Sequence, residues 1–424
     1  MELSLPKGTR DFAPDEKILR DKVVFTLKEV FELYGFAPLE TPVFEKFDVL
    51  SSKYTGGAEI LKETFKLKDQ GNRDLGLRYD LTVPLSRFVG MNPNLKMPFK
   101  RYQMGEVFRD GPVSVGRYRQ FTQCDVDIIG SNSLASDVEI MSLIDFAFKK
   151  FGLDSVIRFN SRKLLNDMLN YCGIEKSRQE SVILSLDKLE KFGAPSVKSE
   201  LVTQGIDEMK ITKILGIAGI KGTNEEKIRQ IKVLLKESEG VLEIEKILEL
   251  LEKFSLNAEF DASLARGLSY YTGTVIETFL KNSGIKSSVC SGGRYDNMIG
   301  SLLEKESVPA MGVSFGVDRI YDAMLEKNDE KPKTTVKVYV IPIKTVDESL
   351  EIVKKLRDSG INTDIDLIGK GPSKNLDYAN ALKIPYVLFV GKKELEEGKF
   401  KLRDMKSGKE EMVEFETIKR KLEN

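Results

Sequence analysis

Two alternating segments of the chain collect polar side chains on one face. In 100–109 and 120–130 that face carries two arginines, two glutamines and two aspartates: Arg101, Gln103, Arg109, Gln123, Asp125 and Asp127. An arginine fork beside such acceptors suits a ligand with both a phosphate and an ammonium group. A solvated sheet face is the ordinary alternative, but aspartate is a poor strand former and two lie on this face.

A second cluster, at 265–274, has the sequence Ala-Arg-Gly-Leu-Ser-Tyr-Tyr-Thr-Gly-Thr. Arg266 stands beside Gly267 in an apolar, strand-like setting, and a buried arginine needs an anionic partner. The adjacent Tyr270 and Tyr271 offer hydroxyls on opposite faces. The partner of the arginine is either an anionic ligand or a structural carboxylate, and the sequence leaves both open.

Two glycine-rich stretches, 291–296 and 312–319, form the third cluster. Strands rich in glycine let a flat ligand approach the backbone closely. Arg319 is expected at the start of the helix that follows, where its guanidinium could lie over the ring of a ligand. The chain has no Walker-type phosphate loop and no GxGxxG after a strand. A nucleotide would therefore be held on a sheet face by arginines.

The composition excludes several kinds of chemistry. No histidine occurs among the 424 residues, so Ser-His-Asp and Cys-His catalysis, histidine-ligated zinc and a histidine general base are excluded. The three cysteines, Cys124, Cys172 and Cys290, are widely spaced and form no CxxC pair. This spacing argues against a disulfide framework or a thiolate metal site and favours a reducing compartment. No protein metal ligand is therefore predicted.

The chain is expected to be a soluble, cytoplasmic protein without a membrane partner. Its first residues contain no apolar run of signal length, and no stretch reaches the roughly 18 apolar residues of a membrane span. Lysine plus arginine and aspartate plus glutamate are equal at 66 each. Any binding of nucleic acid must therefore depend on local patches.

The elements that must position the first cluster follow from periodicity and turn residues. A helix begins at Pro14 and ends before Gly35, as proline and glycine at these positions indicate. The segment 100–130 is predicted to be a hairpin because both arms alternate and the connection is rich in turn residues. A helix from Ser133, its N-cap, to Phe151 follows the hairpin.

The remaining elements divide the chain. A Lys/Glu/Leu-rich helical stretch at 172–256 lies between strand segments at 156–159 and 258–279, and we interpret it as an inserted module. A charged linker at 327–333 follows. Beyond it, strands alternate with helical patterns, which indicates a small α/β domain with a mostly parallel sheet. Its predicted strands are 336–343, 362–367 and 386–390.

Taken together and in order, these segments resemble class II aminoacyl-tRNA synthetases, and specifically the histidyl-tRNA synthetase family. The matching parts are that family's opening segment, motif 1 with its proline at the dimer interface, motif 2, the histidine-specific motif and motif 3. They correspond to 6–12, 41–45, 108–130, 265–277 and 312–319. The resemblance covers nearly the whole chain and is weakest in the helical insertion. Its most specific part is ARGLSYY together with RYRQFTQCD.

The resemblance implies a fold and a division into domains. We expect an α/β chain whose α+β catalytic core, at 1–325, holds the antiparallel class II sheet flanked by helices, with a helical insertion at about 173–256. A C-terminal α/β anticodon-binding domain is expected at 334–424, with a local patch at 369–374 that meets tRNA. The protein would be a homodimer.

The resemblance also implies roles at the nucleotide. Arg109 and Arg117 would contact the phosphates of ATP, and Arg319 would clamp the nucleotide. Arg266 would bridge the amino-acid carboxylate and the α-phosphate. Activation brings two anions together, so Arg109 and Arg266, with Mg²⁺, would supply the opposing charge. Many class II enzymes hold adenine with a glutamate two residues after the motif 2 arginine, where this chain has Gly111.

For the amino acid, the resemblance implies that Asp80 and Thr82 hold the α-amino group together with Gln123. Asp127 and Tyr271 would bind the two imidazole nitrogens. The full set expected at histidine is Asp80, Thr82, Arg109, Gln123, Asp127, Arg266, Tyr270 and Tyr271. The motif 2 loop, at 110–116, would meet the acceptor end of tRNA, and Ser269 replaces an aspartate that many members have.

The implied reaction is that of a histidine–tRNA ligase, in which ATP activates L-histidine to histidyl-adenylate and pyrophosphate before transfer to the 3′ end of tRNA(His). The alternative is a non-charging paralogue that acts as regulatory subunit of the ATP phosphoribosyltransferase of histidine biosynthesis. Such paralogues typically lack the ARGLxYY segment and the C-terminal domain, and this chain has both. A different class II synthetase is disfavoured by the two adjacent tyrosines.

Overall fold

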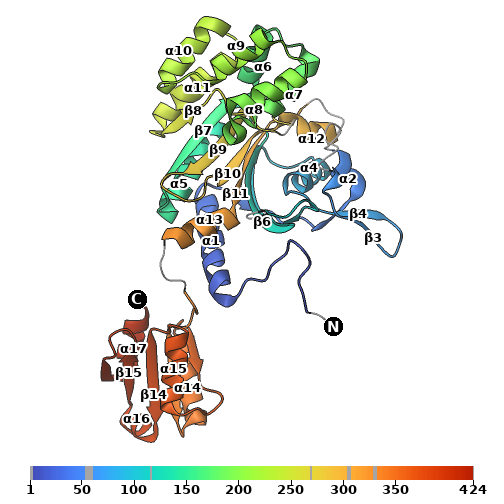
Figure 1. Ribbon diagram of the computed structural model, residues 1–424. Helices are drawn as coiled ribbons and strands as arrows, with labels where there is room; N and C mark the ends of the chain where they lie inside the picture. Colours follow the sequence, from blue (N-terminus) through green and yellow to red (C-terminus); the bar gives the residue numbers. More distant parts are fainter. Residues whose placement is uncertain are drawn as a thin grey trace. The chain divides into compact units, whose positions relative to one another are not determined.

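A computed structural model describes residues 3–52, 61–114, 117–267, 270–302, 307–327 and 332–423 (Figure 1). By internal contacts the chain forms two compact units. One comprises Met1–Arg10 and Lys22–Lys327, and the other Asp11–Asp21 and Asn328–Asn424. The domain ranges expected from the sequence, 1–325 and 334–424, stay a prediction.

The larger unit is built on an eight-stranded sheet with helices on both sides (Figure 1). In spatial order its strands are β1 (Ala37–Pro38), β5 (Phe99–Phe108), β6 (Gln120–Ile129), β11 (Ala310–Gly316), β10 (Cys290–Arg294), β9 (Thr274–Leu280), β7 (Ser155–Ser161) and β8 (Ala258–Phe260). Every neighbouring pair is antiparallel except β1–β5 and β7–β8. The predicted antiparallel sheet flanked by helices, and the hairpin within it, are confirmed.

The register of β5, β6 and β11 assembles the polar face. Arg101 lies opposite Asp127 and Gln103 opposite Asp125, while Ser314 of β11 lies beside Asp125 on the other side. The two residues from β5 expose 0% and 1% of their surface, and the two aspartates 5% and 3%. The alternative of a solvated sheet face is therefore wrong for these four side chains.

The opposite face of the same strands packs on an aromatic core. Phe31 of α1 (Pro14–Leu33) has its ring centroid 5.4 Å from that of Tyr102 and 5.6 Å from that of Phe315. Phe148 of α5 (Ala135–Phe151) stacks on Phe315 at 6.0 Å. These contacts bury the apolar residues that alternate with the polar ones, as the two-residue period of a strand requires.

Two local predictions are corrected. Helix α5 begins at Ala135, not Ser133, and Leu134 is its N-cap. The Ser133 hydroxyl accepts a hydrogen bond from the Ala135 N–H at 3.3 Å, so the serine ends the preceding turn. Arg266 lies in a loop between β8 and β9. The chain leaves the edge strand β8 there and must cross β7 to reach β9, which a continuous strand could not do.

The predicted helical stretch is confirmed as a module between β7 and β8 (Figure 1), but the module begins at Arg162, ten residues before the predicted start at 172. These strands pair in parallel, with Ile157 opposite Ala258, so the module leaves and re-enters the sheet at neighbouring strands. Its helices are α6 (Arg162–Tyr171), α7 (Lys176–Leu186), α8 (Leu189–Thr203), α9 (Glu208–Ala218), α10 (Asn224–Leu235) and α11 (Glu239–Lys253). Across the described segments of the chain, no helix is long and apolar enough to span a membrane.

A smaller three-stranded sheet supports the segment that precedes Asp80. Its order is β2 (Phe44–Lys46), β4 (Asp74–Leu77) and β3 (Lys66–Lys68). Just after β4, the Arg78 guanidinium donates to two backbone carbonyls, each at 2.8 Å. Asp80 Oδ1 then accepts hydrogen bonds from the first two backbone N–H groups of α4 (Thr82–Met91), at 3.1 and 3.0 Å. Asp80 therefore caps this helix.

The smaller unit contains a five-stranded sheet. Its order is β13 (Thr363–Ile365), β12 (Val338–Ile343), β14 (Tyr386–Gly391), β15 (Lys399–Asp404) and β16 (Glu410–Glu414). The first three strands are parallel, as predicted. The sequence analysis missed β15 and β16, which continue the sheet in antiparallel fashion. In β15 the apolar Phe400 and Leu402 alternate with charged residues, and in β16 only Met412 and Val413 are apolar. Neither strand has the continuous apolar run that revealed the buried parallel strands.

Candidate active site

One cavity of about 1240 Å³ in the larger unit gathers the residues singled out in the sequence. All ten residues expected at histidine or ATP line this cavity: Asp80, Thr82, Arg109, Arg117, Gln123, Asp127, Arg266, Tyr270, Tyr271 and Arg319. They come from the turn before α4, the β5–β6 hairpin, the loop after β8 and the start of α13 (Val317–Lys327). The fold therefore joins motifs that are far apart in the chain.

Arg109 presents a positive charge that is not paired with a carboxylate of the described residues. Its guanidinium lies between two rings, 4.2 Å from the centroid of Tyr79 and 4.9 Å from that of Phe121. Its Nε donates to the Tyr79 carbonyl at 3.3 Å. Among the residues with described positions, no acidic side chain forms an ion pair with it. The stacking orients the guanidinium without cancelling its charge, which suits an anionic ligand.

Arg266 forms an ion pair with Glu277 of β9. Asp187, at the end of α7, faces the same guanidinium and accepts a hydrogen bond from the Gly267 N–H. Burial works against the charge of Arg266, but Tyr271, Glu277 and Asp187 raise its pKa above the ordinary value. Its Nε is buried and has no hydrogen-bond partner among the described residues. Of the two partners that the sequence left open for Arg266, the structural carboxylate is therefore confirmed.

Arg319 brings a third guanidinium to the same place. It lies in the first turn of α13 and donates through Nη1 to the Ser288 carbonyl. Burial lowers the pKa of Arg319, Glu277 opposes this shift, and the positive charges of Arg266 and Arg109 add to it. Three arginines from separate segments are thus close enough to repel one another, which is the electrostatic setting of an anion site.

Arg117 lies at the exposed rim of the cavity, with 56% of its side chain accessible. It pairs with Glu63, with 2.9 Å between Nη2 and Oε1. The same carboxylate fills the space beside Gly111, where a Cβ would lie 2.8 Å from Oε1. The position that carries a glutamate in many class II enzymes is therefore crowded by Glu63. Ser269 and residues 115–116 of the motif 2 loop lie outside the described residues.

Asp127 is oriented by two groups behind it. The Tyr295 hydroxyl donates to Oδ1 at 2.5 Å. Arg101 Nη2 lies 2.7 Å from Oδ2, in an ion pair whose angles are not those of a hydrogen bond. Burial raises the pKa of Asp127, and both Arg101 and the Tyr295 hydroxyl oppose that shift. The carboxylate is thereby held against the sheet while it still lines the cavity.

Two glycines of β10 and β11 make room for protein side chains. A Cβ on Gly312 would lie 1.9 Å from Asp127 Oδ1, and one on Gly293 would lie 2.9 Å from the Tyr271 ring. At these two positions the Asp127 carboxylate and the Tyr271 ring occupy the space that a Cβ would fill, while close approach of a flat ligand stays a prediction. Both of these side chains were expected in the site, and the glycines permit their positions.

Asp125 is a cavity residue to which the sequence analysis gave no individual role. It is 5% exposed and lines the cavity between Gln123 and Asp127. Burial raises the pKa of Asp125 to about 7, Arg101 opposes the shift and Asp127 adds to it. The signal that could have found it is the alternation itself, since every second residue of β6 from Gln123 to Asp127 faces the same ligand space.

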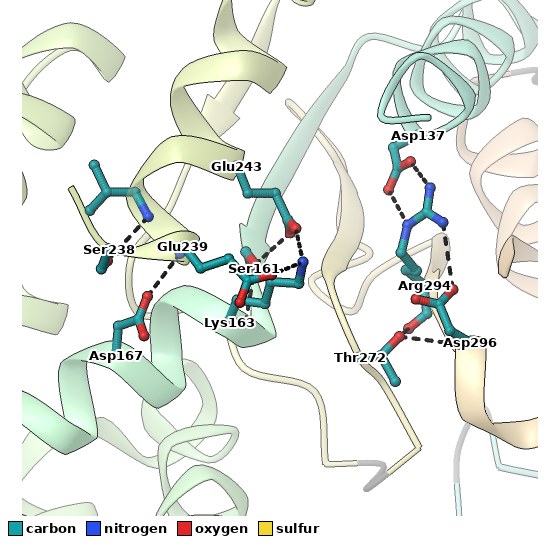
Figure 2. A network of polar contacts seen from close by, with 12 residues as sticks. Asp137, Ser161, Lys163, Asp167, Ser238, Glu239, Glu243, Thr272, Arg294 and Asp296 are labelled. Atoms are coloured by element: carbon teal, nitrogen blue, oxygen red, sulfur yellow. Dashed lines mark hydrogen bonds and ion pairs between the residues drawn. The ribbon is translucent and has the colours of Figure 1, made fainter. Parts of the chain in front are cut away.

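A buried polar network holds the segment around Thr272, which leads into β9 (Figure 2). Arg294, at the end of β10, pairs with Asp137 of α5. The Arg294 carbonyl accepts a hydrogen bond from the Thr272 N–H at 2.8 Å, and the Thr272 hydroxyl accepts one from the Asp296 N–H at 3.1 Å. The end of the loop is therefore tied to α5 and to β10, which limits the movement of the preceding tyrosines.

Figure 2 also shows how the helical module is anchored to the sheet. The Ser161 hydroxyl, at the end of β7, donates to Glu243 of α11 at 2.6 Å. Lys163 Nζ lies 3.1 Å from the same carboxylate. Within the module, Asp167 of α6 accepts a hydrogen bond from the Gly240 N–H of α11 at 2.8 Å and so ties these two helices together. The module is thus joined to the sheet next to the loop that carries Arg266.

Comparison with known proteins agrees with this geometry. The family model described as Histidyl-tRNA synthetase matches residues 8–320, and the one described as Anticodon binding domain matches 337–424. Histidine–tRNA ligase 1 of Bacillus cereus is 42% identical over 428 residues, which cover 99% of this chain and 97% of that protein.

Solved structures also resemble the chain. The crystal structure of histidyl-tRNA synthetase from Nostoc sp. PCC 7120 has a TM-score of 0.88 and 32% identity, and all of both chains is covered. A Bacillus halodurans structure titled ATP phosphoribosyltransferase regulatory subunit/histidyl-tRNA synthetase has a TM-score of 0.76 at 22% identity, covering 92% of this chain and 99% of that one, and supports the fold alone. With a family model that matches nearly three quarters of its length and relatives above 40% identity, the chain belongs to the histidyl-tRNA synthetase family.

Proposed function

We propose that the chain is a histidine–tRNA ligase. It activates L-histidine with ATP to form histidyl-adenylate and pyrophosphate, and then transfers the histidyl group to the 3′ end of tRNA(His). The observation that carries this proposal is the single cavity in which three arginines and a row of buried carboxylates lie together. Such a cavity offers cations to a triphosphate and acceptors to an amino acid.

The arginines account for the activation step. The histidine carboxylate attacks the α-phosphate, and these two anions repel each other. Arg109 and Arg266 supply the opposing charge from fixed positions, and Arg319 clamps the nucleotide. Removing one such preorganised group costs on the order of 10²–10³ in rate. The Nε of Arg266, which has no hydrogen-bond partner within the described segments, can bind the substrate anions while the pair with Glu277 is kept.

Magnesium would add positive charge at the phosphates. Among the described residues there is no group of three or more acidic, cysteine or histidine side chains that could hold a metal ion. Mg²⁺ binds in many nucleotide sites through one or two carboxylates and the substrate phosphates. We therefore expect the phosphates of ATP to supply most of its ligands here.

The other residues of the cavity bind histidine in this proposal. Asp127 and Tyr271 bind the two imidazole nitrogens, and Tyr270 lines the same pocket. An ionised carboxylate has about four acceptor positions, so Asp127 can accept from the ring as well as from Tyr295. Asp80, Thr82 and Gln123 lie near the α-amino group, and Arg117 meets the phosphates from the rim.

The smaller unit would bind the anticodon of the tRNA. Asp366 is buried and accepts hydrogen bonds from the Ile368 and Gly369 N–H groups at 2.9 and 3.1 Å, so the loop after β13 is firmly shaped. Leu367 and Ile368 are 75% and 78% exposed on this loop. Apolar side chains held in the open on a rigid loop are suited to contact with unstacked bases. Gly369 also begins the patch at 369–374 expected from the sequence.

The protein would act as a cytoplasmic homodimer. Phe44 and Met91 are 56% and 70% exposed beside the Arg87–Glu45 ion pair in the region of motif 1. Apolar side chains that gather into one exposed patch mark protein interfaces, and a dimer contact would cover these two. Size-exclusion chromatography with light scattering should give about twice the 47.8 kDa chain mass. A reducing compartment agrees with three free, buried cysteines.

The decisive test is amino-acid-dependent exchange of pyrophosphate into ATP, measured with each of the twenty amino acids. Histidine alone should support exchange. If no amino acid supports it while histidine still binds, the regulatory-subunit alternative would gain support. That alternative is disfavoured because relatives at 42% identity over the full chain are named Histidine–tRNA ligase.

A further inference from the structure

Two carboxylates from different parts of the larger unit act on Arg266. Glu277 lies on β9, within the sheet, and forms the ion pair with the guanidinium. Asp187 is the C-cap of α7, within the helical module, and its charge acts on the same guanidinium. All three residues line the cavity. The helical module therefore contributes a charged group to the surroundings of an arginine on which the proposed reaction depends.

Asp187 also contacts the backbone next to the arginine. Its carboxylate accepts a hydrogen bond from the Gly267 N–H. A Cβ at position 267 would lie 2.8 Å from Asp187 Oδ2 and 3.8 Å from Leu184 Cδ2, so the glycine allows the end of α7 to pack closely on the loop. One side chain therefore acts on the guanidinium of Arg266 and on the peptide group that follows it.

Other elements tie the two ends of the loop between β8 and β9. Asn160 of β7 donates through Nδ2 to the Leu264 carbonyl at 2.9 Å. At the far end, the Gly273 carbonyl accepts a hydrogen bond from the first N–H of α6 at 2.8 Å. Arg266 lies between these ties, where Asp187 reaches the loop from the module. Removal of the Asp187 side chain would leave the backbone beside the arginine without that hydrogen bond.

The charge of Asp187 also restricts the guanidinium. Burial raises the pKa of Asp187, and Arg266 is the first of the groups that oppose this shift. Arg319 and Arg266 act on each other as like charges, and a second carboxylate offsets that repulsion. A guanidinium that pairs with one carboxylate can turn about it, whereas two carboxylates on different elements fix its place and its plane.

We infer that Asp187 is a positioning residue for the reaction, through which the helical module sets the Arg266 guanidinium at the reacting anions. The inference rests on the proposed function and adds to it a residue outside the segments that resemble class II motifs. A misplacement of about 1 Å can cost on the order of 10²-fold in rate. Because Asp187 acts through Arg266, its loss should lower kcat and leave the KM values for histidine and ATP nearly unchanged.

The test is a double-mutant cycle, measured by histidine-dependent exchange of pyrophosphate into ATP. Asp187→Ala alone should lower kcat by about 10- to 100-fold and keep both KM values within about threefold. Asp187→Asn should lose less, because its amide oxygen can still accept from the Gly267 N–H. In the Arg266→Ala background, Asp187→Ala should change kcat by less than about twofold, because the group that it positions is gone.

Glu200→Gln is the matched control within the module. Glu200 accepts hydrogen bonds from Ser185 and Lys188, at 2.9 and 2.7 Å, which lie on either side of Asp187 in the sequence. Glu200 is not part of the cavity lining. The substitution loosens the same end of α7 from within the module, so it should lower the melting temperature slightly and leave kcat unchanged.

A purely structural role of Asp187 would give a different pattern. An unchanged kcat in Asp187→Ala, the same loss in the Arg266→Ala background, or an equal loss in Glu200→Gln would each overturn the inference. If Asp187→Ala does not fold, as judged by circular dichroism, Asp187→Asn takes its place in the cycle. Absence of histidine-dependent exchange in the wild-type protein would overturn the proposed function, and the inference with it.

Discussion

The two ends of the cavity place opposite charges in different kinds of structure. Arg109 follows the last residue of β5, Arg319 follows β11, and Arg266 lies in a loop. The carboxylates of Asp125 and Asp127 project instead from the second half of β6. This strand is paired with β5 on one side and with β11 on the other. The cationic end is thus built from strand ends and loops, and the anionic end from the interior of the sheet.

The difference follows from what each charged group tolerates. A guanidinium stays charged at any ordinary pH and can stack on rings, as Arg109 does on Tyr79 and Phe121. A carboxylate in the sheet interior loses water and has its pKa raised, as Asp125 shows. We therefore expect substitutions at the arginine end to slow the chemical step, and those at the carboxylate end to weaken recognition of histidine.

The largest effect is expected from Arg266→Ala. This substitution removes charge that faces both reacting anions, so histidine-dependent pyrophosphate exchange should fall by about 10²–10³-fold, mainly in kcat. Exchange kinetics with saturating histidine and ATP measure this loss. Arg73→Ala, at an exposed ion pair with Asp69, is the control and should leave exchange unchanged. Near-normal exchange in Arg266→Ala would refute the role of this arginine.

Removal of residues 332–424 should leave both ends of the cavity intact. Charging of tRNA(His) should fall on the order of 10²-fold, because contacts worth about 1–3 kcal/mol for each stacked base are lost. Adenylate formation, measured by pyrophosphate exchange, should be spared. A parallel loss of both activities would show that the two units do not separate binding of tRNA from activation.

Asp127→Ala should raise the KM for histidine by about 10-fold or more and change the KM for ATP little, because a hydrogen bond to a charged group is lost. The two constants come from exchange measured at varied histidine and varied ATP. Equal effects on both would argue against binding of the imidazole ring. The substitution also removes the ion-pair partner of the fully buried Arg101, so the melting temperature should fall as well.

The smallest effect concerns pH. Burial raises the folded-state pKa of Asp125 from 3.8 to about 7. At a pH between these two values, the carboxylate therefore takes up a proton when the chain folds. The stabilising contribution of Asp125 to the free energy of unfolding is fully present below pH about 4 and is lost as the pH rises toward 7. In Asp125→Asn the decline in melting temperature between pH 5 and 8 should therefore be smaller, by roughly a few degrees.

An identical decline in wild type and Asp125→Asn would contradict a buried, titrating carboxylate. Several other groups interact with Asp125 and shape the same curve, so the difference between the two proteins is the relevant quantity. These groups are Arg78, Asp80, Arg101, Cys124, Asp127, Cys290 and Tyr295.

Much of the site followed from local pattern. Alternation along 120–130 predicted which residues of β6 share a face, and the resemblance of the ARGLSYY and RYRQFTQCD segments identified ten residues that line one cavity. The start of α5 and the loop around Arg266 were misplaced. In both cases the correct answer depends on contacts with other segments, such as the crossing from β8 to β9.

The sequence by itself determined the kind of chemistry, since a chain without histidine must use arginines and carboxylates, and it also determined the faces of the hairpin. Only the tertiary structure decided which charges are paired. Asp187 reaches the Arg266 loop from the helical module, and Gly312 leaves space for Asp127. Asp125 keeps an acceptor that has no donor in the part of the chain that the structure describes. The physical reason is that periodicity is a property of neighbouring residues, while partners and burial depend on segments that meet only when the chain folds.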